Sequence, residues 1–264
     1  MDNYKQTLPR YESMKYRRCG QSGLLLPEIS LGFWHNFGAD ASKDNCREIV
    51  ECAFDNGITY FDLSNNYGPP CGAAESLFGE IFWSSLAAHR DEVIMATKAG
   101  HDMWPGPYGE WGSRKTIIAS IDQSLKRMKL DYVDIFYSHR PDPLTPIEET
   151  MQAFVDVVRQ GKALYVGLSK YPPEMAAKAY AYLREQHVPC LVYQGRYNMI
   201  DRNVEPEILP QAEAAGAGFV AFSPLAQGLL TGKYQHGIPE GSRMTHSGFL
   251  KPDVLTPELL DQIA

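Results

Sequence analysis

The sequence predicts an α/β fold in which a parallel sheet closes toward a (βα)8 barrel, the TIM-barrel architecture. Seven segments with strand character alternate with segments of helical periodicity, and no linker interrupts residues 1–264, so we expect a single domain. The strand segments also end in polar residues, and barrel enzymes build their sites from the C-terminal ends of many strands. A doubly wound open sheet shares the alternation but gathers its site at one switch point, so the strand ends favour the barrel.

A β-hairpin is predicted before the alternation begins. MKYRRC and LLLPEI are joined by the turn GQSG, which places the hairpin at residues 14–29. ISLGFW, at residues 29–34, then reads as the first barrel strand. An apolar stripe at helical spacing runs from Cys46 to Phe54, and Gly57 ends the predicted helix.

The alternation continues to residue 224. Strands are predicted at 59–64, 93–98, 132–139, 163–169, 191–197 and 219–224, with helices near 77–82, 117–128, 147–160, 173–186 and 206–215. The strands are nearly continuous apolar runs, as expected of parallel strands that are covered on both faces. Their C-terminal ends carry Asp62, Lys98, His139, Ser169, Gln194 and Ser223.

Composition narrows the class of protein. The formal net charge of −7 argues against a nucleic-acid partner, and no apolar run is long enough to cross a membrane, so we expect no membrane insertion. Five cysteines, odd in number and without a CxxC pair, fit a reducing compartment, and the N-terminus lacks the apolar run of a signal peptide. We therefore expect a cytoplasmic protein. No histidine pair has zinc-site spacing, so no metal is expected.

Four residues that can handle protons converge on the predicted barrel face. Each alone has an ordinary explanation: Lys98 as a solvated strand end, Tyr67 as loop packing, His139 as a hydrogen-bonded strand end. Together they could act as a single proton-donating group. A carbonyl that receives hydride needs a proton, and a tyrosine can supply it if a neighbouring cation favours its phenolate. We expect Lys98 to be that cation, Asp62 to orient it, and His139 to polarise the carbonyl.

Two nucleotide-binding motifs fail on their context. GAGFVA, at residues 216–221, fits G-x-G-x-x-A, but it follows a predicted helix and precedes a strand, the reverse of the dinucleotide fingerprint. GLLTGKY resembles a P-loop, but its glycine spacing is one residue short and Tyr234 replaces Ser/Thr. A nucleotide would therefore bind outside both schemes.

Six ordered segments resemble one known family. FDLSNNYG, ATKAG, YSHR, GLSKY, YQGRYN and FSPLAQGLLTGKY resemble the aldo-keto reductases from about residue 14 to residue 264. WHNFG, NNYGPP and DMWPGPYG resemble the branch that holds bacterial L-glyceraldehyde 3-phosphate reductases and is related to potassium channel β subunits. The resemblance implies a TIM barrel that binds NADP(H) without a Rossmann motif. It also implies a catalytic tetrad of Asp62, Tyr67, Lys98 and His139, with Tyr67 as the proton donor.

The resemblance further implies a set of cofactor contacts. The nicotinamide amide would meet Ser169 and Gln194, with Asp62 nearby, and its ring would stack on Phe222, where the family often has Tyr or Trp. Trp34 matches a position near the nicotinamide and the substrate. The loop that covers the pyrophosphate matches Ser223, Leu225, Gln227, Gly228 and Lys233, with Arg243 beyond it. Lys233 and Arg243 also have the ordinary explanation of surface cations.

The C-terminal end departs from the family pattern. The family's eighth strand and the segment that grips the adenosine 2′-phosphate have no counterpart here, so we expect a C-terminally incomplete barrel that ends in the helical pattern TPELLDQIA. Either further residues follow in the complete protein or the chain is a truncated product, and the uncapped helix pattern favours the first.

The resulting functional hypothesis is an NADPH-dependent reductase of small aldehydes such as glyceraldehyde 3-phosphate or methylglyoxal, working as a homo-oligomer. A regulatory subunit that binds NADPH but turns over little is the alternative, and an unrelated barrel activity such as an isomerase is weaker. A phosphorylated substrate would need a cation, and the sequence does not rank Arg114, Lys115, Arg140 and Lys170.

Overall fold

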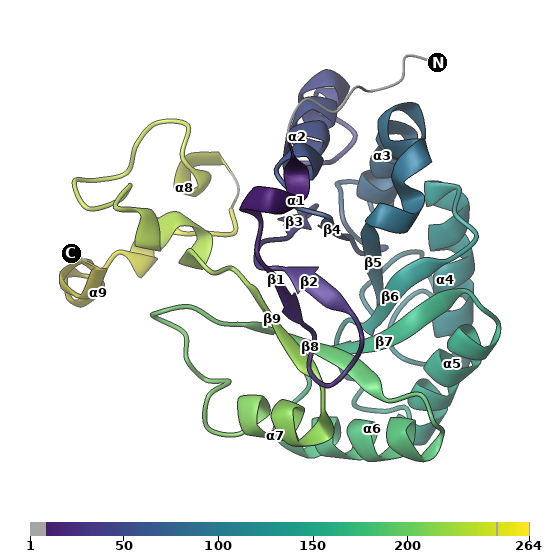
Figure 1. The fold of residues 1–264 in the computed structure, drawn as a ribbon. Helices are drawn as coiled ribbons and strands as arrows, with labels where there is room; N and C mark the ends of the chain where they lie inside the picture. Colours follow the sequence, from purple (N-terminus) through teal and green to yellow (C-terminus); the bar gives the residue numbers. More distant parts are fainter. Residues whose placement is uncertain (1–8, 247, 264) are drawn as a thin grey trace.

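Seven parallel strands, hydrogen-bonded in chain order, form the main sheet of the protein. The structure is a computed structural model that describes residues 9–246 and 248–263. The strands are β3 (Leu31–Gly32), β4 (Tyr60–Asp62), β5 (Ile94–Ala99), β6 (Val133–Ser138), β7 (Ala163–Ser169), β8 (Cys190–Arg196) and β9 (Gly218–Phe222). The sheet curls into a half-barrel with its helices on the outside (Figure 1), which confirms the predicted fold class.

The connecting helices follow the predicted alternation. They are α2 (Lys43–Asp55), α3 (Ala73–Ile81), α4 (Arg114–Met128), α5 (Ile147–Arg159), α6 (Pro173–Glu185) and α7 (Ile208–Ala215). Ser42 and Ser113 cap α2 and α4, because each side chain accepts a hydrogen bond from a backbone N–H of the first turn. The helix α3 continues through a π-helical turn, Phe82–Leu86, and a 3-10 segment, Ala87–Glu92, which periodicity did not predict.

The predicted hairpin is present and covers the N-terminal end of the half-barrel. Its strands, β1 (Tyr16–Arg18) and β2 (Leu25–Pro27), pair antiparallel. The backbone N–H of Gln21 in its turn donates to the carbonyl of Gly216, just before β9. A short helix, α1 (Arg10–Ser13), precedes the hairpin and was not predicted.

Two apolar cores lie on the two faces of the sheet. The larger one fills the space between the strands and the outer helices, with Phe33, Phe61, Phe78, Phe136 and Phe154 among its buried rings. A smaller inner core joins the hairpin to the strands through Cys19, Leu26, Tyr60, Ile135, Tyr137 and Val192. Burial on both faces explains why the strands read as continuous apolar runs.

The sheet has two unpaired edges within the described residues. There β9 pairs only with β8, and β3 pairs only with β4. The strand predicted at 29–34 is reduced to Leu31–Gly32, because a two-residue ladder with β4 is its sole partner in the described sheet.

The segment after β9 forms a small lobe of its own beside the half-barrel, yellow-green to yellow in Figure 1. It contains η3 (Ala226–Thr231), α8 (Arg243–His246), η4 (Pro252–Val254) and α9 (Pro257–Ile263). Leu229, Tyr234, Met244 and Leu250 form its core. The predicted C-terminal helix is thus present as α9, although Ala264 lies outside the described residues. Within the described part of the chain, no helix has the length and apolarity needed to span a bilayer.

Candidate active site

The C-terminal ends of β4, β5 and β6 bring three of the predicted residues together. Asp62 is the last residue of β4, Lys98 lies near the end of β5, and His139 directly follows β6. Parallel register holds these ends level, since Asp62 pairs with Ala96 and Lys98 pairs with Tyr137. Tyr67 comes from the loop after β4, whose end is tied to α3 by a hydrogen bond from the Ala74 backbone N–H to the Tyr67 carbonyl.

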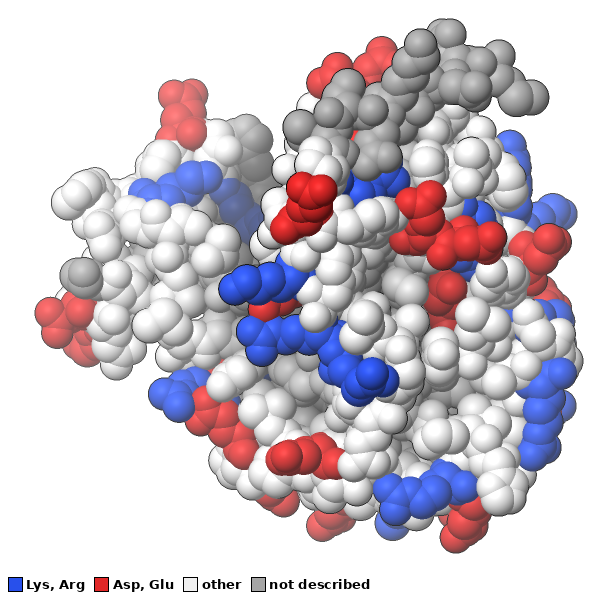
Figure 2. All heavy atoms as spheres, viewed as in Figure 1, with Lys and Arg blue, Asp and Glu red and all other residues white. Residues whose placement is uncertain are grey.

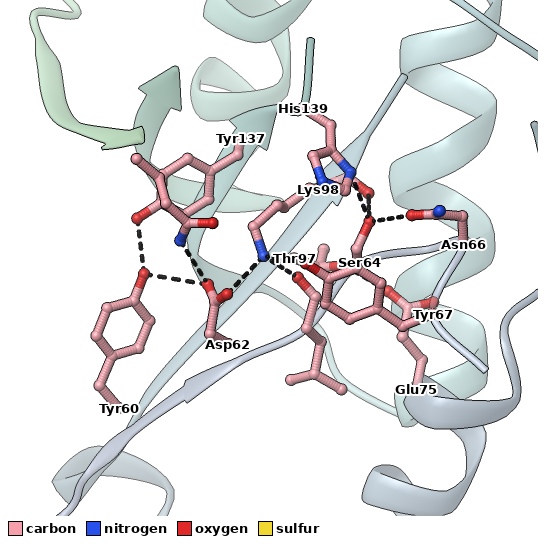
Figure 3. A network of polar contacts seen from close by, with 12 residues as sticks. Tyr60, Asp62, Ser64, Asn66, Tyr67, Glu75, Thr97, Lys98, Tyr137 and His139 are labelled. Atoms are coloured by element: carbon pink, nitrogen blue, oxygen red, sulfur yellow. Dashed lines mark hydrogen bonds and ion pairs between the residues drawn. The ribbon is translucent and has the colours of Figure 1, made fainter. Parts of the chain in front are cut away.

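Lys98 is the centre of this constellation and is completely buried. Its Nζ donates to Asp62 Oδ2 at 2.7 Å, to the Leu63 carbonyl at 2.7 Å and to Tyr67 Oη at 3.4 Å (Figure 3). These acceptors match the three protons of an ammonium group. Burial alone would lower the pKa of Lys98, but the charge of Asp62 and the hydrogen bonds outweigh it and raise the pKa above its ordinary value. Lys98 is therefore a permanent cation.

Tyr67 differs from the expectation in one respect. Lys98 does lower its pKa, as predicted, but burial and the charge of Asp62 act in the opposite direction and are larger together. The net result is a pKa above the ordinary value for tyrosine. Tyr67 therefore holds its proton at neutral pH, the form that an acid requires.

His139 is buried as a neutral ring. Burial lowers its pKa well below the ordinary value, and the nearby cations Lys98 and Lys170 lower it further. Its Nδ1 lies 3.0 Å from Ser64 Oγ, which also lies 2.7 Å from Asn66 Oδ1. Because Ser64 occupies Nδ1, Nε2 is the ring nitrogen left for a ligand. The sequence prediction missed Ser64, two residues after Asp62, where strand alternation would place it on the same face.

A pair of buried tyrosines contacts Asp62 through hydrogen bonds. Tyr60 Oη lies 2.6 Å from Tyr137 Oη and donates to Asp62 Oδ1 at 3.4 Å (Figure 3), and Gln194 Nε2 donates to the same oxygen at 3.2 Å. Gly167 makes room for this pair, because a Cβ there would lie 2.4 Å from the Tyr137 ring. The sequence prediction missed both tyrosines, since a tyrosine in an apolar strand looks like ordinary core.

A second buried carboxylate, that of Glu75, connects the elements around the site by hydrogen bonds. Glu75 of α3 accepts a hydrogen bond from Thr97 Oγ1 at 2.5 Å, next to Lys98 in the chain, and another from Arg127 Nε at 2.7 Å. These bonds tie α3, β5 and α4 together. Since α3 also holds the end of the Tyr67 loop, Glu75 links the two elements that carry Tyr67 and Lys98.

A cavity of about 1100 Å³ opens beside these residues and runs down to the hairpin. Of the predicted site residues, it is lined by Trp34, Asp62, Tyr67, His139, Gln194, Phe222, Ser223 and Gln227. Lys98 and Ser169 are buried in the wall behind it. Leu225 and Lys233 are exposed beyond β9, and Arg243 of α8 has its guanidinium 5.9 Å from the centre of the Trp34 ring. Leu225, Gly228, Lys233 and Arg243 are outside the lining set.

Two of the predicted cofactor contacts have buried polar atoms without a hydrogen-bond partner. Ser169 Oγ, at the end of β7, and Gln227 Oε1, after β9, make no hydrogen bond in the structure. Buried polar groups are normally paired, so each of these is available to a ligand. A hydroxyl beside the Gln194 amide suits a carboxamide group such as that of a nicotinamide, so the residues present fit the predicted cofactor.

The four candidate cations for a substrate phosphate differ in their partners and in whether they line the cavity. Arg114 forms an ion pair with Asp156, Lys115 lies over the Tyr108 ring, and Arg140 pairs with Glu110. Lys170 alone among these four lines the cavity. It directly follows Ser169 and has Nζ 3.3 Å from His101 Nε2. In the described chain, no cluster of three or more histidine, cysteine or acidic side chains is arranged to hold a metal ion.

Comparison with known proteins agrees with this geometry. A family model described as "Aldo/keto reductase family" matches residues 28–264. The chain belongs to the aldo/keto reductase family. It is 56% identical to an Escherichia coli (strain K12) L-glyceraldehyde 3-phosphate reductase over 254 residues, which are 96% of this chain and 73% of that protein. It is 39% identical to an Arabidopsis thaliana probable voltage-gated potassium channel subunit beta over 235 residues, 87% of this chain and 70% of that protein.

Membership of the aldo/keto reductase family makes the chain an oxidoreductase, and it confirms the predicted resemblance. Proteins of this family generally use NAD(P)H. Chemically, a neutral phenol beside a buried ammonium group can donate a proton and leave a stabilised phenolate.

Proposed function

We propose that this aldo/keto reductase reduces small aldehydes to alcohols with NADPH and that Tyr67 is the proton donor. The observation that carries the proposal is the contact between Tyr67 Oη and Lys98 Nζ, 3.4 Å long, on the wall of the cavity that His139 also lines. The 56% identity to a protein named L-glyceraldehyde 3-phosphate reductase supports an aldehyde as the substrate.

The residues of the chain divide the work of proton transfer. When bound, a nicotinamide cofactor would supply the hydride that adds to the carbonyl carbon of the substrate. Tyr67 gives its phenolic proton to the carbonyl oxygen. Lys98 stabilises the phenolate left behind, and Asp62 keeps Lys98 charged and in position. With Ser64 donating to Nδ1, the neutral His139 ring carries its proton on Nε2 and donates it in a hydrogen bond to the carbonyl oxygen.

Some of the proposed cofactor contacts line the same cavity, and the others lie on the segment after β9 or are buried beside it. Ser169 and Gln194 would hold the nicotinamide amide, and Phe222 would stack on its ring. Residues 223–233 would cover the pyrophosphate, with Lys233 and Arg243 as its cations. The two unpartnered oxygens of Ser169 and Gln227 support this assignment.

The alternative function is a subunit that binds NADPH but has little turnover. The 39% identity to a protein named as a potassium channel subunit favours it. The two functions predict different results once the cofactor is bound, because only a reductase consumes NADPH when an aldehyde is added.

The test is a titration followed by a turnover assay. We expect NADPH to bind, measured by its fluorescence, and to be consumed when glyceraldehyde 3-phosphate or methylglyoxal is added, measured by its absorbance. The Tyr67→Phe variant should lose about 10²–10⁴-fold in kcat/KM while binding NADPH nearly as well, because it lacks only the acid. Tyr108→Phe, at an exposed tyrosine, is the matched control and should keep full activity. Full activity in Tyr67→Phe would remove Tyr67 from the role, and binding without turnover in the unmodified protein would favour the subunit.

The domain organisation, compartment and oligomeric state are also proposals. We propose that residues 1–264 act as one barrel domain in a cytoplasmic homo-oligomer. All five cysteines are free thiols, which supports a reducing compartment. Light scattering of the purified protein would measure the oligomeric state.

A further inference from the structure

Lys170 is the last member of a row of side chains that begins at the proposed proton donor. The Tyr67 and His139 rings have their centroids 5.9 Å apart, and the His139 and His101 rings are 4.5 Å apart. His101 Nε2 then lies 3.3 Å from Lys170 Nζ. All four side chains line the same cavity, so a ligand with its carbonyl at Tyr67 can extend along this row to Lys170.

Lys170 has no carboxylate partner among the described residues. By contrast, Lys43 pairs with Glu80 and Lys162 pairs with Asp122. The one hydrogen-bond partner that the described chain gives to Lys170 Nζ is the neutral His101 ring. Lys170 as a whole is exposed, but partial desolvation in the cavity and the nearby cations Lys98, Arg140 and Arg196 lower its pKa to about 8. The cavity therefore concentrates positive charge at this point although the protein is acidic overall.

The backbone of Lys170 is tied to the neighbouring strand. Its φ is +59°, in the left-handed region, as it also is for Lys129 and His187. The backbone N–H donates to the Gln194 carbonyl at 3.3 Å. Lys170 is therefore anchored next to Gln194, which lines the same cavity.

We infer that Lys170 and His101 form a subsite for the phosphoryl group of a phosphorylated aldehyde. The inference rests on the proposed function, because it places the carbonyl of the same substrate at Tyr67 and His139. A phosphoryl group carries nearly two negative charges and several acceptor oxygens, and a lysine binds it as a point charge. Arg140 is not the phosphoryl ligand, since Glu110 and the Gly100 carbonyl already accept its hydrogen bonds. Arg196 also lines the cavity, but its guanidinium lies over the Phe222 ring and its Nε lies 3.9 Å from Asp201 Oδ2.

The decisive measurement is a comparison of two aldehydes with variants of Lys170. Lys170→Met should lower kcat/KM for glyceraldehyde 3-phosphate by about 10–100-fold, the range expected for a lost hydrogen bond to a charged group. The same variant should leave kcat/KM for methylglyoxal nearly unchanged, because that aldehyde has no phosphoryl group. Lys170→Arg should recover part of the loss. Lys115→Met, at a lysine outside the cavity, is the matched control and should affect neither aldehyde.

A binding measurement tests the subsite apart from turnover. In calorimetry, glycerol 3-phosphate should bind the unmodified protein at least about tenfold more tightly than Lys170→Met. His101→Phe should weaken this binding as well. If the unmodified protein reduced neither aldehyde, the proposed function would fail, but glycerol 3-phosphate binding would still decide the subsite.

Three results would overturn the inference. One is an equal loss for both aldehydes in Lys170→Met. Another is a weaker affinity of that variant for NADPH, which would make Lys170 a cofactor contact. The third is glycerol 3-phosphate binding that does not depend on Lys170.

Discussion

The two sides of the cavity are built in different ways. On the side of β4–β6, the proposed proton-transfer residues are buried and bonded to one another, and every residue of β6 is buried. On the side of β9, the strand is only partly covered and Leu225 is 54% exposed. The chain just after β9 is shaped by unusual backbone conformations, since Ser223, Ala226 and Gln227 all have positive φ.

We interpret the β4–β6 side as a preorganised site for proton transfer and the β9 side as the part that binds the cofactor. Lys98 would be costly to bury without Asp62, so the protein itself must complete that network. Among the residues proposed for the cofactor, two buried oxygens, Ser169 Oγ and Gln227 Oε1, have no hydrogen-bond partner. We therefore expect substitutions on the β4–β6 side to affect both folding and activity, and those on the β9 side to affect cofactor affinity alone.

The largest effect should follow from breaking the buried ion pair. Lys98→Met leaves the Asp62 carboxylate buried without its cation, and the free energy of unfolding should fall by about 3–5 kcal/mol. Chemical denaturation would measure the loss. Adding Asp62→Asn to this variant should recover part of the stability, because no unpaired charge then remains.

An exposed ion pair provides the control for Lys98→Met. Lys162 Nζ lies 2.6 Å from Asp122 Oδ1, close to the 2.7 Å between Lys98 and Asp62, but both side chains are partly in solvent. Lys162→Met should cost at most about 1 kcal/mol. Equal losses in the two lysine variants would contradict the difference between the two sides of the cavity.

A smaller effect should appear as a pH dependence of stability. The pKa of His139 is lowered in the folded protein, so the unfolded chain takes up this proton first as the pH falls below about 6.5. The stability that His139 contributes above that pH is therefore lost on acidification, by at most about 1.4 kcal/mol per pH unit, the limit set by one proton. In His139→Gln, unfolding measured across this range should be less pH-dependent by that amount. The same slope in both proteins would show that His139 titrates normally.

The smallest effect is expected on the β9 side. Phe222→Ala removes the proposed stacking ring and should weaken NADPH binding by about tenfold, from the lost aromatic contact and its buried area. Thermal stability should change little, because Phe222 is only partly buried. Phe222→Tyr keeps the ring and should bind NADPH normally. A large loss of stability with unchanged NADPH affinity would reverse the assignment of this side.

Much of the fold could be predicted because it depends on local patterns. Apolar runs, helical stripes and polar strand ends placed the seven strands and six helices of the half-barrel, and parallel strands bring their ends to the same side. The contact of Lys98 with Asp62 followed from the cost of burying an ammonium group. The π-helical turn after α3 and the helix α1 had no such pattern, since their conformations depend on packing.

The sequence by itself predicted the fold class, the family and the grouping of Asp62, Tyr67, Lys98 and His139, because each depends on residue type, periodicity or motif. Only the tertiary structure showed that Tyr60, Tyr137 and Gly167 support Asp62, because those residues meet across three strands. It also decided the sign of the Tyr67 pKa shift, since burial and charge act in opposite directions there. The choice of Lys170 among four cations was likewise tertiary, because it depends on which side chains have carboxylate partners and which face the cavity.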